Sequence, residues 1–230
     1  MMRYYPVNLD VRNRGCLVVG GGAVGERKVK TLLECGARVT VIAPWVTEYL
    51  RNLASGNRIC LKVRAYQPSD PDGHFLVIGA TGDEKVNRQI SEDASGRGIL
   101  CNIADRPRAC TFVLPAVVSQ GDLVIAISTS NKSPAVAKRI RQALEKEFGP
   151  EYATLLKVMG AIRERLLAEA KSPESHKQKF ERLLDEGLLE MIREERTQEV
   201  STLLQDALGE GYSWEELMRT DRGSEKPCSV

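Results

Sequence analysis

The 230-residue sequence predicts an α/β fold in which a parallel β-sheet carries helices on both faces. Three observations support this prediction. Short apolar, β-branched segments alternate with helical patterns over the first hundred residues. A glycine-rich turn joins the first of these strands to the first helix. After about residue 110 the pattern changes, first to an antiparallel hairpin and then to charge-rich helices.

The strands and helices of the first part follow from residue periodicity. Strands are predicted at residues 15–20, 38–43, 58–63, 74–81 and 99–103. Helices are predicted at residues 26–35, 46–54 and 83–95, with Asp83 as the cap of the last one. Because connections between parallel strands are right-handed, this alternation predicts a parallel sheet covered on both faces.

The next segment predicts a hairpin and a helix. Residues 111–118 and 122–128 have strand character and flank Ser119-Gln120-Gly121, which predicts an antiparallel pair. Ser133 and Pro134 then supply a cap and a first-turn proline. The helix that they introduce is predicted over residues 135–148, and its first two turns are basic.

The remaining sequence predicts a helical domain. Residues 151–208 are helical and charge-rich, with a restart at Pro173 and a break at Gly187. One helix is predicted from Met191 to Leu208, and a short last turn follows at residues 214–218.

Composition excludes several classes of protein. The net charge of +2 predicts no binding of nucleic acid. No segment resembles a membrane span or a signal peptide, which predicts a cytoplasmic protein. The cysteines form no CxxC pair, which argues against a disulfide framework or a metal centre; they lie at positions 16, 35, 60, 101, 110 and 228.

The glycine-rich turn points to a dinucleotide. Residues 20–25, Gly-Gly-Gly-Ala-Val-Gly, fit G-x-G-x-x-G between a strand and a helix. Gly20 permits the tight turn, Gly22 lets the backbone approach a pyrophosphate, and Gly25 lets the helix pack on the strand. Ala23 and Val24 open the helix, whose free N–H groups attract the anion. We therefore predict a Rossmann-like, NAD-binding domain; a glycine-rich turn in a non-binding α/β domain is the alternative.

One part of the dinucleotide pattern is missing. An acidic residue about 20 positions further on, at the end of the second strand, normally binds the ribose 2′-hydroxyl. Ala43, Pro44 and Trp45 stand there instead, and no arginine offers a partner for a 2′-phosphate. We expect NAD rather than NADP, with the adenosine held by backbone near Pro44 and Trp45.

Four stretches resemble one enzyme family. Residues 101–116, CNIADRPRACTFVLPA, closely resemble the C-N-x-x-D…F-x-x-P-A/S signature of precorrin-2 dehydrogenases, which include the dehydrogenase half of siroheme synthase. Residues 5–28, 80–87 (ATGDEKVN) and 126–134 (AISTSNKSP) resemble other elements of the same family. The resemblance covers roughly residues 3–148, and we expect no methyltransferase half in these 230 residues.

The resemblance implies an organisation in three parts. A Rossmann-like parallel sheet domain is followed by a small α+β dimerisation region and a helical C-terminal domain. The implied homodimer has each active site near the dimer cleft. We place the NAD-binding domain at residues 1–112, the dimerisation region at 113–149, the helical domain at 150–219 and a disordered tail at 220–230.

The implied reaction is the NAD-dependent oxidation of precorrin-2 to sirohydrochlorin, on the way to siroheme or cobalamin. In the family, the aspartate that matches Asp105 is the residue on which catalysis centres. Asp105 follows the fifth strand, at the edge where open α/β sheets hold ligands, and a carboxylate there can act as acid or base. The alternative to a catalytic role is a structural one, in which Asp105 caps the turn Asp-Arg-Pro. Thr81, in the matched ATGDEKVN element, is expected at the cofactor.

The tetrapyrrole substrate carries many carboxylates, which basic side chains can bind. Lys138 and Arg139 flank the expected cleft, although solvated surface charge is the alternative for any one basic residue. The expected substrate-binding residues are Arg106, Arg108, Ser128, Thr129 and Lys132.

Some family members also insert ferrous iron into sirohydrochlorin, and this activity is a further hypothesis. Asn131 replaces a glycine that the family often has in the loop at residues 126–134, which leaves the loop geometry open. No resident metal site is expected, because His74 and His176 are better explained as structural or exposed residues. Two other functions stay open: an NAD-sensing regulatory module without catalysis, and a dehydrogenase for another small polar substrate.

Overall fold

The computed structural model of the chain divides into two compact units. One comprises residues 1–114 with 130–132, and the other residues 115–129 with 133–230. The structure describes residues 4–104, 106–168 and 173–220. The predicted tail lies outside these ranges except for Thr220, which ends the last helix.

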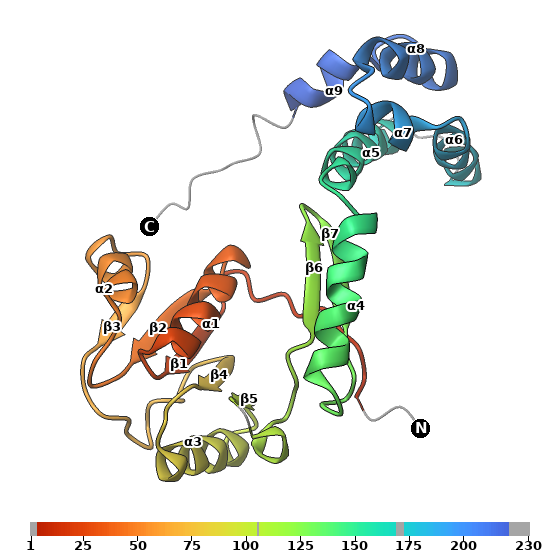
Figure 1. The fold of residues 1–230 in the computed structure, drawn as a ribbon. Coiled ribbons are helices and arrows are strands. Elements are labelled where there is room, and N and C mark those ends of the chain that lie inside the picture. The colour runs from red at the N-terminus through yellow and green to blue at the C-terminus, as the bar shows by residue number, and fades with distance from the viewer. Residues whose placement is uncertain (1–3, 105, 169–172, 221–230) are drawn as a thin grey trace. The chain divides into compact units, whose positions relative to one another are not determined.

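The first unit is built on a five-stranded sheet in which every neighbouring pair is parallel (Figure 1). The strand order is β3-β2-β1-β4-β5, so the chain moves outward from β1 in one direction and then returns to build the other half. This topology confirms the predicted Rossmann-like fold class. The strands are β1 (Gly15–Val19), β2 (Arg38–Ile42), β3 (Cys60–Lys62), β4 (Leu76–Gly79) and β5 (Leu100–Ile103).

Helices cover both faces of this sheet. Helices α1 (Ala23–Glu34) and α2 (Glu48–Ser55) pack on one face, where Val29 and Leu50 belong to the same core as the strand residues Val18 and Val41. Helix α3 (Glu84–Gly96) covers the other face, with its own core. The carboxyl ends of the strands lie at one common edge of the sheet, because all five strands run in the same direction. The two cores hold the helices against the sheet.

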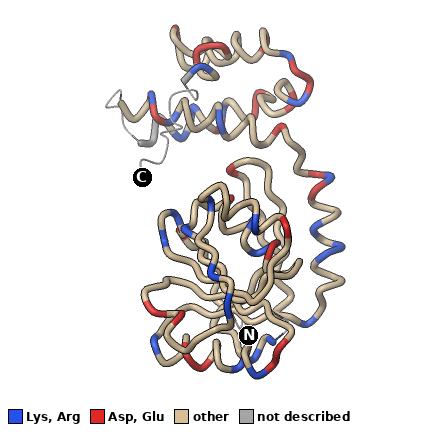
Figure 2. The backbone as a smooth tube through the Cα atoms, turned by 90° about the vertical axis from the view of Figure 1, so that its left-hand side faces the viewer, with Lys and Arg blue, Asp and Glu red and all other residues tan. Residues whose placement is uncertain are grey.

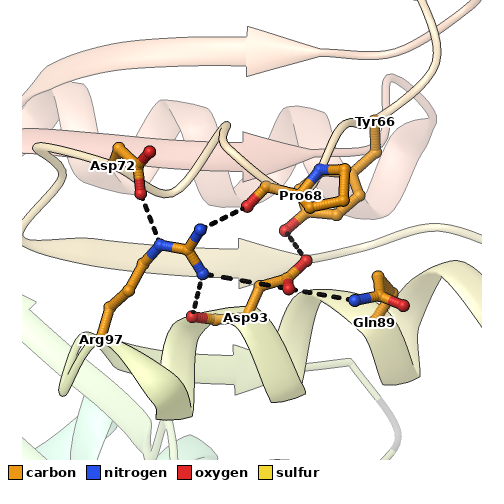
Figure 3. A network of polar contacts seen from close by, with 6 residues as sticks. All are labelled: Tyr66, Pro68, Asp72, Gln89, Asp93 and Arg97. Atoms are coloured by element: carbon orange, nitrogen blue, oxygen red, sulfur yellow. Dashed lines mark hydrogen bonds and ion pairs between the residues drawn. The ribbon is translucent and has the colours of Figure 1, made fainter.

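A polar network replaces a helix in the connection from β3 to β4 (Figure 3). Arg97, just after α3, donates to the Pro68 carbonyl at 2.9 Å and pairs with Asp72. The Tyr66 hydroxyl donates to the Asp93 carboxylate at 2.9 Å. Burial, and then the hydrogen bond to Asp93, raise the pKa of the Tyr66 phenol. The connection is therefore held on α3 by side chains that lie far apart in the sequence.

The second unit begins with the predicted hairpin. Strands β6 (Ala116–Gln120) and β7 (Leu123–Ile127) are antiparallel, and Gln120 pairs with Leu123. The turn is therefore Gly121-Asp122, and the prediction of Ser119-Gln120-Gly121 as the turn was wrong. Gly121 has φ +58°, the left-handed conformation that glycine supplies readily in a two-residue turn.

The first hairpin strand is also shorter than predicted, because residues 111–115 serve another purpose. The Thr111 amide donates to the Cys101 carbonyl at 2.9 Å, which joins this segment to β5. Helix α4 (Pro134–Glu147) follows the hairpin, and the Ser133 hydroxyl accepts from the Val136 amide at 3.2 Å. The predicted cap is thus confirmed.

In the described part of the second unit, further helices pack around a core that includes Leu155, Ile162, Leu183 and Leu204. The predicted single helix from Met191 to Leu208 is two helices, because Glu195 adopts a left-handed φ of +56° between them. The helices are α5 (Glu151–Ala168), α6 (Pro173–Asp185), α7 (Leu188–Arg193), α8 (Thr197–Leu208) and α9 (Trp214–Thr220). Within the described ranges, no helix is both long and apolar enough to cross a membrane.

Candidate dinucleotide-binding site

The glycine turn lies at the carboxyl end of β1, and neither Gly20 nor Gly25 has room for a side chain. Gly20 has φ +122°, and a Cβ built there would lie 2.3 Å from the Ala80 carbonyl oxygen after β4. A Cβ on Gly25 would lie 2.1 Å from the Gly20 carbonyl oxygen. Both contacts are with backbone, which cannot move aside as a side chain can. These glycines therefore set how closely α1 approaches the sheet.

Gly22 differs from these two glycines, because a Cβ built there would meet no backbone atom and only the Trp45 ring, at 3.3 Å. It is the N-cap of α1, and it supplies no side-chain hydrogen bond to the helix. Ala23 and Val24 follow it in the first turn, and both are exposed. The first N–H groups of a helix have no partner within the helix, so this turn offers donors and positive potential to an anion. The missing Cβ at Gly22 leaves the backbone at this helix start accessible, as the predicted pyrophosphate contact requires.

The end of β2 closes one side of this turn. The Gly20 amide donates to the Ile42 carbonyl at 2.9 Å, which joins the two strand ends. Ala43 is buried, whereas Pro44 and Trp45 are exposed. The position that usually carries a ribose-binding carboxylate is thus apolar in the structure, as in the sequence.

The end of β4 closes the other side of the glycine turn. Asn87, which the sequence analysis did not assign to the site, holds this end in place. The Thr81 hydroxyl donates to Asn87 Oδ1 at 2.9 Å, and Asn87 Nδ2 donates back to the Thr81 carbonyl at 2.9 Å. Asn87 on α3 is buried, so this pair holds the turn after β4 beside Gly20. Asp83 caps α3 as predicted, accepting from the amides of Lys85 and Val86. The signal in the sequence that could have pointed to this role was Asn87 itself, the last residue of the ATGDEKVN element.

The chain leaves β5 at the same edge of the sheet. Asp105, the predicted catalytic residue, lies outside the described residues. Its neighbours are described: the Ala104 amide donates to the Gly79 carbonyl at 2.9 Å, and the Arg106 amide donates to the Ile103 carbonyl at 3.2 Å. The residues on both sides of position 105 are therefore tied to the carboxyl ends of β4 and β5.

The segment after residue 106 returns to β5 and packs on it. Cys110 Sγ accepts from the Ile103 amide at 3.1 Å, and Thr111 Oγ1 accepts from the Cys101 amide at 2.8 Å. Burial raises the pKa of the Cys110 thiol, so the thiol stays protonated and acts as a structural donor and acceptor. The contacts make this return a fixed part of the first unit.

The predicted substrate-binding residues belong to both units. Arg106 and Arg108 lie in the first unit, and both are exposed; Arg106 forms an ion pair with Glu84. Lys132 is exposed and groups with the same unit. Basic residues also recur along α4 in the second unit (Figure 2). The described residues contain no group of three or more His, Cys, Asp or Glu side chains that could hold a metal ion.

The loop between β7 and α4 has an unusual backbone. Ser128 and Thr129 belong to the second unit, and the Ser133 amide donates to Thr129 Oγ1 at 3.3 Å. Ser130 and Asn131 both have positive φ, at +52° and +62°. Asparagine enters this left-handed region more easily than most residues with a side chain. Asn131 thus adopts a conformation that glycine also adopts readily.

Comparisons with known proteins agree with this geometry. Residues 7–116 match a family model described as "Putative NAD(P)-binding". The chain is 33% identical to the siroheme synthase of Nitrosococcus oceani over 211 residues, which are 92% of this chain and 45% of that protein. It is 32% identical to the siroheme synthase of Methylococcus capsulatus over 206 residues, 90% of this chain and 44% of that protein.

One solved structure is covered by the match over almost its whole length, unlike the siroheme synthases. SirC, described as a precorrin-2 dehydrogenase, has a TM-score of 0.74 and 26% identity, and the match covers 89% of this chain and 98% of SirC. The chain is thus similar to siroheme synthases and to a precorrin-2 dehydrogenase over about nine tenths of its length. The predicted resemblance is thereby confirmed, and NAD is the cofactor that the matches support. The chain spans just under half the length of the siroheme synthases that it matches.

Proposed function

We propose that this chain is an enzyme that oxidises precorrin-2 to sirohydrochlorin with NAD, in the synthesis of siroheme or cobalamin. The observation that carries the proposal is the match to SirC over 98% of that structure. The glycine turn supports it independently, because its backbone leaves a cradle for a pyrophosphate where Gly22 lacks a side chain.

The chain's own residues divide the binding of NAD between three strand ends. The pyrophosphate is assigned to the turn and the first turn of α1, and the adenosine to the end of β2. Thr81 lines the turn after β4, where its hydroxyl is engaged with Asn87. The proposed cofactor-binding residues are Gly20, Gly22, Ala23, Val24, Gly25, Ala43, Pro44, Trp45 and Thr81.

The oxidation removes two hydrogens from the macrocycle, one as a hydride and one as a proton. When bound, NAD supplies the hydride acceptor. The protein must hold the ring beside the nicotinamide and accept the proton. Asp105 is the proposed base, on the family resemblance and on the position of its neighbours at the carboxyl edge of the sheet.

The carboxylates of the substrate need cationic and hydrogen-bonding partners. Arg106 and Arg108 are exposed next to position 105 in the chain, and arginine binds carboxylates with two parallel hydrogen bonds. Ser128, Thr129 and Lys132 are the proposed partners from the loop before α4.

A homodimer is part of the proposal, and apolar exposure in the second unit supports it. Val117 and Val124 on the hairpin are 42% and 52% exposed, and Val136 and Ile140 on α4 are 49% and 41% exposed. A second copy of the chain is a suitable cover for these exposed apolar side chains of the hairpin and of α4.

Ferrous iron insertion into sirohydrochlorin is a second candidate activity, with iron as a substrate. The observation that favours it is the left-handed backbone of Asn131, at φ +62°, which is a conformation compatible with the glycine that the family resemblance places there. Insertion needs bases that remove pyrrole protons, and Asp105 is the proposed base for this step as well.

One anaerobic experiment tests both activities. Purified chain receives precorrin-2 and NAD, NADH is followed by absorbance, and ferrous iron is then added. We expect NADH in step with sirohydrochlorin; Asp105→Ala should bind NAD but lose this oxidation. Bound NAD without any NADH would instead support an NAD-sensing module. If sirohydrochlorin accumulates but takes up iron no faster than in a protein-free control, only the insertion activity is refuted.

A further inference from the structure

An exposed tryptophan stands at the point where the dinucleotide pattern lacks its acidic residue. Trp45 follows β2 and is 65% exposed, so its indole is accessible to a ligand. Ala43 and Pro44, which precede it, provide no polar side chain for a ribose. Recognition of the adenosine therefore needs a different contact from the usual carboxylate.

The backbone of Trp45 is fixed against the glycine turn. The Thr47 amide donates to the Gly21 carbonyl at 3.0 Å. A Cβ on Gly21 would lie 2.2 Å from the Trp45 carbonyl oxygen, so the two segments are in close backbone contact. The point from which the indole extends is thus fixed relative to the turn, and the ring itself is exposed.

The indole extends toward the start of α1. Its Cη2 atom lies 3.3 Å from the point where a Cβ on Gly22 would stand, and Cζ2 lies 3.9 Å from that point. One edge of the ring therefore borders the pyrophosphate cradle. In this fold the adenosine continues from the pyrophosphate toward the end of β2, which is where the Trp45 ring begins.

We infer that the Trp45 indole is a stacking platform for the adenine base, and that it takes the place of the missing ribose-binding carboxylate. The inference rests on the proposed NAD binding and adds how the adenosine half is recognised. A flat aromatic ring offers a face to any base, and its contribution does not depend on the 2′-hydroxyl. The base, rather than the ribose, thus supplies the affinity at this end of the cofactor.

Fluorescence can report the stacking directly. The chain has two tryptophans, Trp45 and the half-buried Trp214 of the second unit, so Trp214→Phe leaves Trp45 as the single indole. We expect AMP to quench its emission to the same plateau as NAD. Nicotinamide mononucleotide, which lacks the adenine, should leave the emission unchanged. Quenching by nicotinamide mononucleotide but not by AMP would overturn the inference.

Affinity gives the second readout. Trp45→Ala should weaken NAD binding in calorimetry by roughly tenfold or more, whereas Trp45→Phe should keep most of the affinity. Leu167→Ala is the matched control, because Leu167 is 64% exposed and lies in the second unit. 2′-Deoxy-AMP should bind within about threefold of AMP, because Ala43, Pro44 and Trp45 at this strand end have no charged side chain for the 2′-hydroxyl.

The outcomes separate this inference from the function on which it rests. If the unaltered chain binds no NAD, the proposed function fails. If it binds NAD but Trp45→Ala binds it equally well, only the platform is refuted. A loss of more than tenfold with 2′-deoxy-AMP would show that the ribose, and not the base, is recognised at this end.

Discussion

Two glycines of the same turn should separate folding from cofactor binding. Gly25→Ala places a methyl group 2.1 Å from the Gly20 carbonyl oxygen, on the buried side of α1. Alanine favours the helix by about 1 kcal/mol, but overpacking against backbone costs about 1–3 kcal/mol or more. We expect the free energy of unfolding to fall by about 1–2 kcal/mol, because neither α1 nor β1 can yield without moving the core.

Gly22→Ala should have the opposite profile. The residue has φ −81°, which alanine adopts without strain, and its Cβ would meet only the outer edge of the exposed Trp45 ring. Stability should change by less than about 1 kcal/mol. The methyl group would nevertheless occupy the pyrophosphate cradle, so NAD affinity should fall by about tenfold or more, or about 1.4 kcal/mol.

Thermal and urea unfolding measure the first effect, and calorimetric titration with NAD measures the second. Each variant serves as the control for the other, because they alter the same turn by the same methyl group. The assignment of roles would be refuted if Gly25→Ala were as stable as the unaltered chain. It would also be refuted if Gly22→Ala bound NAD with unchanged affinity.

Four further predictions concern the rest of the molecule. The guanidinium of Arg64, which donates to Asp70 at 2.8 Å, holds the pKa of that carboxyl below its usual range. The resulting stabilisation is present above the ordinary carboxyl pKa and is lost as the pH falls through the lowered value. Asp70→Asn should therefore be less stable than the unaltered chain at pH 7. In thermal melts from pH 7 to 3, its stability should also fall less with decreasing pH. The raised pKa of Tyr66 means that its stabilisation is lost as the pH rises above about 10, and Tyr66→Phe should flatten this alkaline loss. Asn131→Gly should keep the stability of the chain, whereas Asn131→Val should cost about 1–3 kcal/mol in urea unfolding, because a β-branched residue is strained at φ +62°. Ile140→Glu should shift the proposed homodimer to a monomer in sedimentation velocity, because it places a charge on an apolar face.

Each of these predictions has a contradicting result. An unchanged acid transition in Asp70→Asn would remove the linkage to Arg64. If Tyr66→Phe and the unaltered chain lose stability identically above about pH 10, the alkaline loss does not come from the Tyr66 phenol. Equal stability of the two Asn131 variants would show that the loop relaxes to another backbone. A dimer that survives Ile140→Glu would place the contact between copies elsewhere.

Local patterns in the sequence were sufficient for most of the fold. The five strands, the caps at Asp83 and Ser133, and the glycine turn all depend on neighbours within a few residues. Such features follow from side-chain periodicity and backbone hydrogen bonding, which are written in consecutive residues. The resemblance carried by residues 101–116 added a catalytic hypothesis at Asp105, which periodicity alone does not supply.

The tertiary structure decided what depends on distant residues. It placed the buried Asn87 against Thr81, and it laid the Trp45 indole beside Gly22. It also broke the predicted helix after Met191 at Glu195, whose left-handed backbone no local pattern signals. These features arise when the core brings separate strand ends together, since packing can then outweigh the preference of any single segment.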